Sequence, residues 1–358
     1  MTFALIGCSR ISINHIKAAK INNLETLAIC DLSKERMDEV IAEHYNNAHI
    51  RCYTDYLQML DEIKPDLIAI TTPSGSHAKI AVDCINKGIN LIIEKPIALS
   101  LSDADAIIAA ADEKGVKVCA CHQNRFNASV QIIREAVEAG RFGKMMHGVA
   151  NIRWNRGEEY YKQAPWRGTW EQDGGVLMNQ CIHNIDILRW MMGDDIIEVV
   201  GMTDRLNHDF IETEDLGLAL VRFKNGSYGI IEGTTNIYPQ NLEETLYLFG
   251  DKGTVKAGGK SINTIEEWNF ADGSENKEEI NKLIQEKTTN SIGSGNIPLY
   301  ADVIDAIKND RPVYIDARAG RRALELVLAI YKSAAEGKSA ELPLKSCSTV
   351  DFLGRFDK

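Results

Sequence analysis

The chain has 358 residues, of which 44% are hydrophobic and 25% are charged, and its formal net charge is −11. This length predicts two domains, and the composition is that of a globular protein whose apolar runs are too short to span a membrane. The acidic balance argues against nucleic acid as a partner, because phosphate binding requires clustered Lys and Arg. The eight cysteines lack metal-ligand spacing, and residues 3–6 are too short an apolar run for a signal peptide. We therefore expect a cytoplasmic protein with reduced thiols and no metal.

Residues 1–31 have the order of a dinucleotide-binding unit. The pattern predicts a strand over 3–6, a turn over 7–12, a helix over 13–20 and a strand over 27–30. Only Gly7 remains of the three glycines of that motif, since Ser9 and Ser12 stand in the other two places. Asp31 lies about 20 residues beyond the turn, where a carboxylate accepts hydrogen bonds from the adenosine ribose and favours NAD over NADP. Its alternative role is to cap the helix predicted over 34–44.

Strands and helices alternate as far as residue 121, which predicts a doubly wound parallel sheet with helices on both faces. Strands are expected over 67–71, 90–94 and 117–121, and helices over 76–87 and 102–114. Ligands of such sheets bind at the carboxyl ends of the strands, where this chain has the polar stretches 71–73, 94–96 and 122–125. Lys95 is held between a strand end and Pro96, so its cation can stabilise a developing alkoxide, and the alternative is an ordinary surface lysine.

The chain after Arg125 predicts a second domain with a largely antiparallel sheet. A helix is expected over 128–139, and strands over 145–155, 198–204, 215–223, 227–235 and 244–249. The polar stretch 271–295 predicts an exposed loop or flap, and two helices are expected over 298–308 and 319–337. We thus expect an N-terminal domain over 1–121 and a C-terminal domain over 122–358, whose last helices can pack back on the first domain.

The stretch 173–190 is where we expect the chemistry. If it is helical from Leu177, then Asn179, His183 and Asp186 share one face at positions i, i+4 and i+7. Each of these polar groups costs free energy to bury unless it is hydrogen-bonded. His183 can therefore be a base in a site, or it can be a core histidine that Asp186 satisfies.

Residues 151–170 combine aromatic and cationic side chains. They hold three of the five tryptophans, Trp166 among them, two adjacent tyrosines, and Arg153, Arg156 and Arg167. Because arginine binds carboxylate or phosphate through its fork of N–H groups, this mixture predicts a site for a ligand with apolar ring faces and anionic groups. A strand face with a subunit contact also favours Trp, Tyr and Arg, and it is an equal alternative.

Landmarks along nearly the whole chain resemble those of the Gfo/Idh/MocA family of pyridine-nucleotide-dependent oxidoreductases. They are Gly7 with Arg10-Ile11, Thr72-Pro73 with His77, Glu94-Lys95-Pro96, Asn124-Arg125-Phe126, Gly174-Gly175 with His183 and Asp186, and the helix over 321–333. The resemblance implies a Rossmann domain and a C-terminal α/β domain whose open sheet often forms oligomer interfaces. It also implies that Lys95 and His183 are catalytic. Asn179 stands where sugar and inositol dehydrogenases of the family often have aspartate, which leaves His183 as the base.

The same resemblance, together with the motifs above, assigns the ligand contacts. NAD is the expected cofactor. Its adenosine and pyrophosphate are expected to contact Gly7, Ser9, Arg10, Ile11 and Asp31, and its nicotinamide side Thr72, Pro73, His77, Glu94, Lys95 and Gln123. The substrate is expected to contact Arg125, Arg153, Arg156, Trp166, Arg167, Asn179 and His183.

Several of these segments are similar to the enzymes that oxidise C3 of UDP-N-acetylglucosaminuronate, namely 123–126, 153–154, 160–161, 166–170 and 179–183. The predicted function is therefore hydride transfer from a sugar secondary alcohol to NAD, in a homodimer or homotetramer. Alternatives are an inositol or other sugar dehydrogenase of the family, a glycosidase that uses bound NAD without net oxidation, and a regulatory sensor. The intact pair of Lys95 and His183 argues against the sensor.

Overall fold

The computed structural model describes residues 1–358 apart from 46–48, 194, 260, 291–294 and 358. The described residues form two compact units. The first combines Met1–Ala98, Ser102–Gln123 and Gly293–Arg321, and the second combines Leu99–Leu101, Asn124–Ile292 and Arg322–Lys358. Across the described part of the chain, no helix is both long and apolar enough to cross a membrane.

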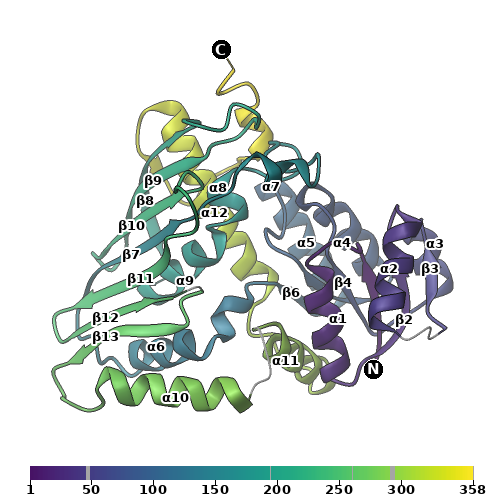
Figure 1. Cartoon of the computed structure of the whole chain (residues 1–358), viewed down its shortest axis with the longest axis horizontal. Helices are drawn as coiled ribbons and strands as arrows, with labels where there is room; N and C mark the ends of the chain where they lie inside the picture. Colours follow the sequence, from purple (N-terminus) through teal and green to yellow (C-terminus); the bar gives the residue numbers. More distant parts are fainter. Residues whose placement is uncertain (46–48, 194, 260, 291–294, 358) are drawn as a thin grey trace. The chain divides into compact units, whose positions relative to one another are not determined.

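The first unit contains a six-stranded sheet in the order β3-β2-β1-β4-β5-β6, in which every neighbouring pair is parallel. Strands and helices alternate along the chain (Figure 1). The strands are β1 (Thr2–Ile6), β2 (Glu25–Cys30), β3 (Arg51–Tyr53), β4 (Leu67–Ile70), β5 (Asn90–Ile93) and β6 (Val118–Ala120). The helices are α1 (Ser12–Ile21), α2 (Lys34–His44), α3 (Tyr56–Glu62), α4 (His77–Asn86), α5 (Leu101–Lys114) and α11 (Asn296–Lys308). The predicted doubly wound parallel sheet is confirmed, whereas the short β3 and α3 were not predicted.

The second unit contains an eight-stranded sheet in the order β13-β12-β11-β7-β10-β9-β8-β14. Its strands are β7 (Met145–Arg153), β8 (Ile196–Asp204), β9 (Leu216–Phe223), β10 (Tyr228–Thr234), β11 (Glu243–Gly250), β12 (Gly253–Gly258), β13 (Thr264–Phe270) and β14 (Ala340–Glu341). The helices are α6 (Ala128–Glu138), α7 (Glu158–Lys162), α8 (Val176–Asn179), α9 (Ile182–Met192), α10 (Lys277–Asn290) and most of α12 (Ala317–Glu336). In the two units together, short 3-10 helices span Ser74–Ser76, Gln123–Phe126 and Thr349–Phe352. Because β7 and β10 pair in parallel and the other pairs are antiparallel, the sheet is mixed.

Helices α9 and α12 pack on one face of this second sheet (Figure 1). A Cβ on Gly148 of β7 would lie 2.8 Å from Leu188 and 2.9 Å from Met192, both on α9. A Cβ on Gly201 of β8 would lie 2.7 Å from the backbone oxygen of Ile330 on α12. Glycine at these two strand positions therefore lets the helices approach the sheet more closely than a side chain would permit.

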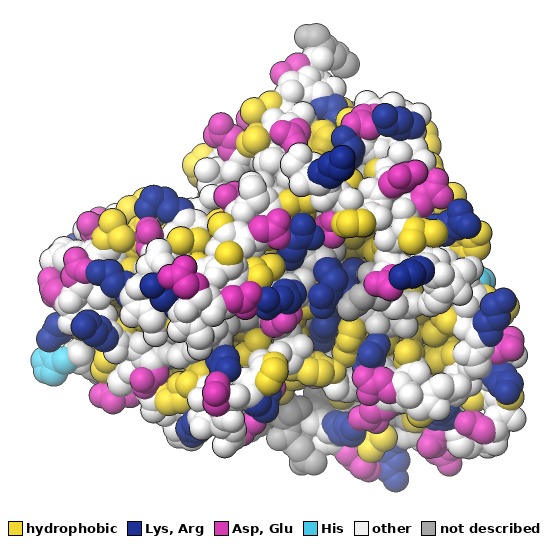
Figure 2. Space-filling view, turned by 180° about the vertical axis from the view of Figure 1, so that it is seen from behind, with side chains coloured by type: hydrophobic (Ala, Val, Ile, Leu, Met, Phe, Trp, Pro, Cys, Tyr) yellow, Lys and Arg dark blue, Asp and Glu magenta, His cyan; other side chains and the backbone are white. Residues whose placement is uncertain are grey.

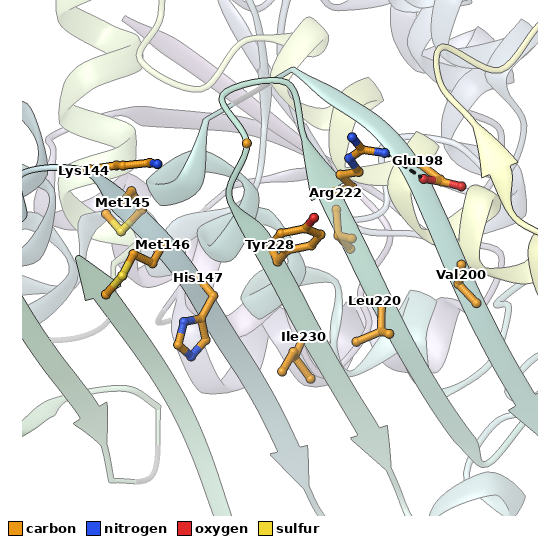
Figure 3. Close-up of a pocket in the computed structure, with 12 residues that line it drawn as sticks. Lys144, Met145, Met146, His147, Glu198, Val200, Leu220, Arg222, Tyr228 and Ile230 are labelled. Carbon is orange, nitrogen blue, oxygen red and sulfur yellow. Dashed lines mark ion pairs between the residues drawn. The ribbon is translucent and has the colours of Figure 1, made fainter. Parts of the chain in front are cut away.

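Apolar side chains are exposed on the opposite face of the same sheet, because successive residues of a strand point to opposite sides. Figure 3 shows Val200, Leu220, Tyr228 and Ile230 standing on the neighbouring strands β8, β9 and β10. Leu220 is 57% exposed. A contiguous apolar area of this kind is typical of an interaction surface, and we call it the outer sheet face.

Charged side chains of both signs are interspersed over the face of the molecule seen in Figure 2. Hydrophobic side chains lie between them on the same face. An anionic ligand of a chain with a net charge of −11 therefore needs cations that are gathered locally at its site.

The expectation of an exposed loop over 271–295 is wrong for its described part, because α10 occupies Lys277–Asn290; residues 291–294 lie outside the described residues. Ile280 and Ile284, four residues apart, are buried, and α10 contacts β13 and α6. Asn276 and Glu279 exchange side-chain hydrogen bonds with each other's backbone amides at 2.9 and 3.0 Å, which satisfies amides at the start of the helix. The helix was missed because its apolar stripe is narrow and most of its residues are polar, although the capping residues Asn276 and Glu279 stand at its start.

The single helix expected from Leu177 is also wrong, because the chain forms α8 and then α9 with a break between them. Asn179 is the last residue of α8, so its predicted i, i+4 relation to His183 on a continuous helix does not hold. His183 and Asp186 remain together on α9.

We expect Ile280→Ala to lower the unfolding free energy by ~2–4 kcal/mol, because truncation of a buried isoleucine loses apolar burial and leaves a cavity. Leu283 on the same helix is 39% exposed, so Leu283→Ala is the matched control and should cost less than ~1 kcal/mol. Urea unfolding measures the two differences, and hydrogen exchange of the α10 amides shows where protection is lost. Equal effects of the two substitutions would contradict a helix that packs through Ile280.

Candidate active site

The turn after β1 packs tightly against the end of β4. Gly7 has a φ of 100°, and a Cβ there would lie 2.7 Å from the carbonyl carbon of Thr71, so glycine is required. Ser9 donates from Oγ to the backbone oxygen of Thr71 at 2.9 Å, and Thr71 donates from Oγ1 to that of Gly7 at 2.5 Å. This close packing fits a turn that presents backbone amides to a pyrophosphate. The individual contacts of Ser9, Arg10 and Ile11 with the cofactor stay predictions.

Asp31 follows β2 and binds the backbone of the same turn. Its Oδ2 accepts from the amide of Cys8 at 2.7 Å, and its Oδ1 accepts from the amide of Ser33 at 2.8 Å. The residue that caps α2 is Ser33, whose side chain accepts from the amide of Arg36, so the alternative of Asp31 as the helix cap is wrong. The carboxylate therefore stands beside the turn, and its contact with the adenosine ribose stays a prediction.

The segments after β4 and β5 are joined through His77. Its Nδ1 lies 2.8 Å from the backbone oxygen of Pro96, and its Nε2 lies 2.9 Å from that of Thr72. Burial lowers the pKa of His77, so the ring is neutral near pH 7 and donates to one of the two carbonyls. Gln123, which follows β6, accepts from the thiol of Cys121 at 3.7 Å.

Glu94 connects the end of β5 to two residues that the sequence did not suggest. Its Oε2 accepts from the backbone amide of Lys95 at 3.1 Å, and its Oε1 lies 2.8 Å from Nε2 of His15. The other ring nitrogen of His15 lies 2.8 Å from the hydroxyl of Tyr300. Among the described residues, His15, Glu94 and Cys121 form a group that could hold a metal ion. The hydrogen bonds of His15 account for this arrangement, and the absence of a metal stays a prediction.

Asn179 and His183, the two candidate residues of the second unit, lie on either side of the break between α8 and α9. The side-chain amide of Asn179 donates to Oδ1 of Asp173, whose Oδ2 accepts from the backbone amide of Gly168 at 2.8 Å. Asp173 therefore anchors Asn179 to the preceding loop. Lys95 belongs to the first unit and His183 to the second.

Asp186, one turn beyond His183, forms a buried ion-pair network. Its carboxylate accepts from Arg125 Nε at 2.6 Å and Nη2 at 2.7 Å, and from Arg189 Nη2 at 3.0 Å. The guanidinium carbon of Arg125 also lies 4.6 Å from the centre of the Trp190 ring. Arg125 is thus held inside the second unit by a bidentate pair, and its contact with the substrate stays a prediction.

Glu214 lies beneath the glycine turn that leads into α8. Its Oε1 accepts from the amide of Leu177 at 3.0 Å and from the hydroxyl of Tyr331 at 2.7 Å. A Cβ on Gly175 would lie 1.7 Å from Oε2 of Glu214, which explains the glycine. Burial raises the pKa of Glu214 to about 8. No sequence motif indicated Glu214 or Tyr331, since they are brought together only by the fold.

The arginines of residues 151–170 divide into two groups. Arg153 donates to both carboxylate oxygens of Glu232 and pairs with Glu243, so its charge is balanced within the sheet. The guanidinium carbons of Arg156 and Arg167 lie 5.3 and 4.1 Å from the centre of the Tyr160 ring. Further ring contacts of these two arginines are with Trp154 and Trp166. This aromatic and cationic cluster fits the predicted ligand site, whereas Arg153 fits the alternative of a strand face.

A parallel sheet with a glycine turn after its first strand, an acidic residue after the second and a lysine after β5 defines a pyridine-nucleotide dehydrogenase. Residues 1–122 match the oxidoreductase family with an NAD-binding Rossmann fold, and residues 130–256 match the GFO/IDH/MocA C-terminal domain. The chain belongs to the Gfo/Idh/MocA family, as an NAD-dependent sugar dehydrogenase.

Two solved structures are similar over nearly the whole chain. The WlbA dehydrogenase of Bordetella pertussis, in complex with NADH and UDP-GlcNAcA, is 37% identical with a TM-score of 0.90, over 96% of this chain and 98% of that one. The WlbA dehydrogenase of Chromobacterium violaceum, with the same ligands, is 33% identical with a TM-score of 0.87, over 96% of each chain. D-apiose dehydrogenase of Paraburkholderia graminis is 26% identical over 95% of this chain and 89% of its own length. The predicted fold, family and NAD cofactor are confirmed.

Asp31→Ala should weaken NAD binding by ~10-fold and change NADP binding less, because the carboxylate accepts ribose hydrogen bonds and repels a 2′-phosphate. Calorimetric titration with each cofactor gives the two Kd values. Asp38, exposed on α2, supplies the matched control Asp38→Ala, which should leave both unchanged. Equal affinity of the unaltered protein for NAD and NADP would remove Asp31 from this role.

Glu214→Gln should remove a pH dependence of stability. Because the pKa is raised from 4.5 to about 8 in the folded state, the folded chain holds this proton more tightly than the unfolded chain between these pH values. The stability of the unaltered protein therefore falls as pH rises from about 4.5 to 8, by an amount on the order of 5 kcal/mol from this group. Melting curves of both proteins at pH 5.5, 7 and 8 test this. A melting-temperature difference that does not shift in favour of the glutamine variant with rising pH would contradict it.

Proposed function

We propose that this chain oxidises C3 of a UDP-linked sugar uronate, UDP-N-acetylglucosaminuronate, with NAD as the hydride acceptor. The observation that carries the proposal is its similarity, at 37% and 33% identity over nearly the whole chain, to two dehydrogenases solved with NADH and UDP-GlcNAcA. NAD, when bound, supplies the carbon that receives the hydride. The chain supplies the base, the charge that stabilises the alkoxide, and the groups that orient the sugar.

His183 is the proposed base, because an ordinary imidazole titrates near ~6.5 and can take a hydroxyl proton at neutral pH. Lys95 provides the cation that stabilises the alkoxide as the proton leaves. Asn179 orients the sugar by hydrogen bonds without carrying a charge, and its own amide is held by Asp173. In this scheme no carboxylate acts as the base, and the carboxylate of Asp173 only holds Asn179 in place.

Arg156 and Arg167 are the proposed cations for the anionic part of the substrate, with Trp166 beside them. They surround Tyr160, which leaves aromatic surface and positive charge side by side. Arg125 and Arg153 contribute less to the proposal, because carboxylates within the chain already pair with both.

Inositol is the second candidate substrate, because myo-inositol 2-dehydrogenase of Thermotoga maritima is 24% identical over 74% of this chain. NADH absorbance is followed with UDP-N-acetylglucosaminuronate, UDP-N-acetylglucosamine, myo-inositol and glucose. We expect the uronate to react fastest and its KM to rise with added salt. If no NADH accumulates, a single-turnover experiment with enzyme in excess shows whether NADH forms and stays bound or no reaction occurs. Release of the sugar without NADH would indicate the NAD-dependent glycosidase. Faster reaction of free neutral sugars would overturn the nucleotide-sugar assignment.

We also propose a homo-oligomer in which a second copy covers the outer sheet face. The face is apolar at its centre and carries Glu198 and Arg222, paired at 3.7 Å (Figure 3). Two copies related by a twofold axis can exchange this pairing while they bury the apolar side chains. A cytoplasmic location fits the eight free cysteines and stays part of the proposal.

Lys95→Ala and His183→Ala should each lower kcat at least ~100-fold and leave the Kd of NAD nearly unchanged, because both groups act in the transition state. Asn179→Ala should be milder and should appear partly in KM. The exposed residues Lys87 and His49 supply the control variants Lys87→Ala and His49→Ala. Full turnover in either catalytic variant would exclude that residue from the mechanism.

Leu220→Glu should dissociate the oligomer, because it places an unpaired charge in the outer sheet face. Leu57, 43% exposed on α3, gives the matched control Leu57→Glu, which should leave the assembly intact. Sedimentation velocity measures both. An unchanged assembly in Leu220→Glu would contradict this interface.

A further inference from the structure

Three buried side chains form a continuous chain of contacts below the end of β5. His15, on α1, is 0% exposed and lies 2.8 Å from Oε1 of Glu94 through Nε2. Its Nδ1 lies 2.8 Å from the hydroxyl of Tyr300, which is buried on α11. The second oxygen of Glu94 accepts from the backbone amide of Lys95 at 3.1 Å. Residues from three distant segments thus meet at the carboxyl group that precedes the candidate catalytic lysine.

The partners of His15 determine which of its nitrogens carries the proton. An ionised carboxylate can only accept hydrogen bonds, so Nε2 donates to Glu94. With that proton on Nε2, Nδ1 can accept from the hydroxyl of Tyr300. Burial raises the pKa of Tyr300 well above its ordinary value, which keeps that hydroxyl protonated. Every polar atom of the buried imidazole therefore has a partner.

Two further buried groups, Cys121 and His77, interact electrostatically with both Glu94 and Lys95. Burial, and then Glu94, raise the pKa of Cys121 well above its ordinary value, so the thiol remains protonated. Burial lowers the pKa of His77, so its ring is neutral near pH 7. The Glu94 carboxyl is thus held by the His15 ring on one oxygen and by the Lys95 amide on the other, and the Cys121 thiol also hydrogen-bonds to it.

We propose that His15 is a positioning residue for the reaction, acting through Glu94 to hold the backbone of Lys95 in place. The inference rests on the proposed function, in which Lys95 stabilises the alkoxide. Without the Nε2 donor the Glu94 carboxyl can turn, the Lys95 amide loses its acceptor, and the ammonium group departs from its productive position. His15 itself touches neither substrate nor cofactor in this scheme.

Two substitutions separate this role from simple packing. In His15→Gln the side-chain amide nitrogen reaches the place of Nε2 and can still donate to Glu94. In His15→Asn the amide reaches only the place of Nδ1, so it can meet Tyr300 but not Glu94. Tyr300→Phe removes the hydroxyl and keeps the ring, and Tyr45→Phe, a buried tyrosine of the same unit, is its control.

We expect His15→Asn to lower kcat at least ~10-fold with the Kd of NAD changed less than ~3-fold, and His15→Gln to recover most of the loss. Tyr300→Phe should lower kcat by ~2–5-fold, since the ring keeps its Glu94 contact. Melting temperatures are measured for all variants. Equal losses in the glutamine and asparagine variants, or losses that only follow the melting temperature, would overturn the proposal.

Two spectroscopic readouts need no substrate, so they distinguish failure of this inference from failure of the proposed function. In protein labelled with ¹⁵N-histidine, Nε2 of His15 should carry a proton that is hydrogen-bonded to Glu94. The opposite tautomer, which a metal bound at Nε2 would impose, overturns the proposal. In protein labelled with ¹⁵N-lysine, the amide signal of Lys95 is identified by its loss in Lys95→Arg. This signal should move in His15→Asn and stay near its original position in His15→Gln. An amide signal that is the same in both variants also overturns it, whatever the substrate panel shows.

Discussion

Charged groups that are buried beside the candidate active site each require a partner from the chain itself, because an unpaired charge in the interior is too costly to persist. Asp186 is held between Arg125 and Arg189, and Glu94 lies against His15. These networks position Arg125 and the Glu94 carboxyl, which are neighbours of candidate functional residues in the chain. The carboxyl of Glu214 accepts from Leu177 and Tyr331, and its raised pKa keeps it protonated near pH 7, so no buried charge has to be paired beside Tyr331.

Close approach of neighbouring groups to glycine backbone is the second constraint on the site. At Gly7 the turn meets Thr71, and at Gly175 the loop before α8 meets Glu214, both at distances that leave no space for a Cβ. Gly148 and Gly201 allow α9 and α12 to lie directly on the second sheet. Glycines therefore decide how near the candidate catalytic segments come to the sheets that support them.

The use of arginine differs between the interior and the candidate ligand site. Arg125 and Arg153 form short carboxylate pairs that neutralise them within the fold. Arg156 and Arg167 lie against the Tyr160 ring and donate to backbone and amide oxygens. Composition alone grouped these arginines together, and only their partners separate them.

The sequence by itself determined five of the six strands of the parallel sheet and most of the helices between them, because these depend on local patterns of apolar residues and glycine; it missed the short β3 and α3. It also located Lys95 at a strand end and His183 on a helix. The prediction was wrong for α10, because its two buried isoleucines give only a weak helical pattern. It was also wrong in treating α8 and α9 as one helix, because the spacing of apolar residues does not show where a helix is interrupted.

Only the tertiary structure decided which side chains meet. The contacts of Glu94 with His15 and of His15 with Tyr300 span 79 and 285 residues of sequence, and the pairing of Glu214 with Tyr331 spans 117. Local patterns carry no information about such contacts, since they arise when separate elements pack and their buried polar groups must satisfy one another. The types of the candidate catalytic residues were therefore legible in the sequence, while the groups that hold Glu94, Asn179 and Asp186 were set by the packing of the fold.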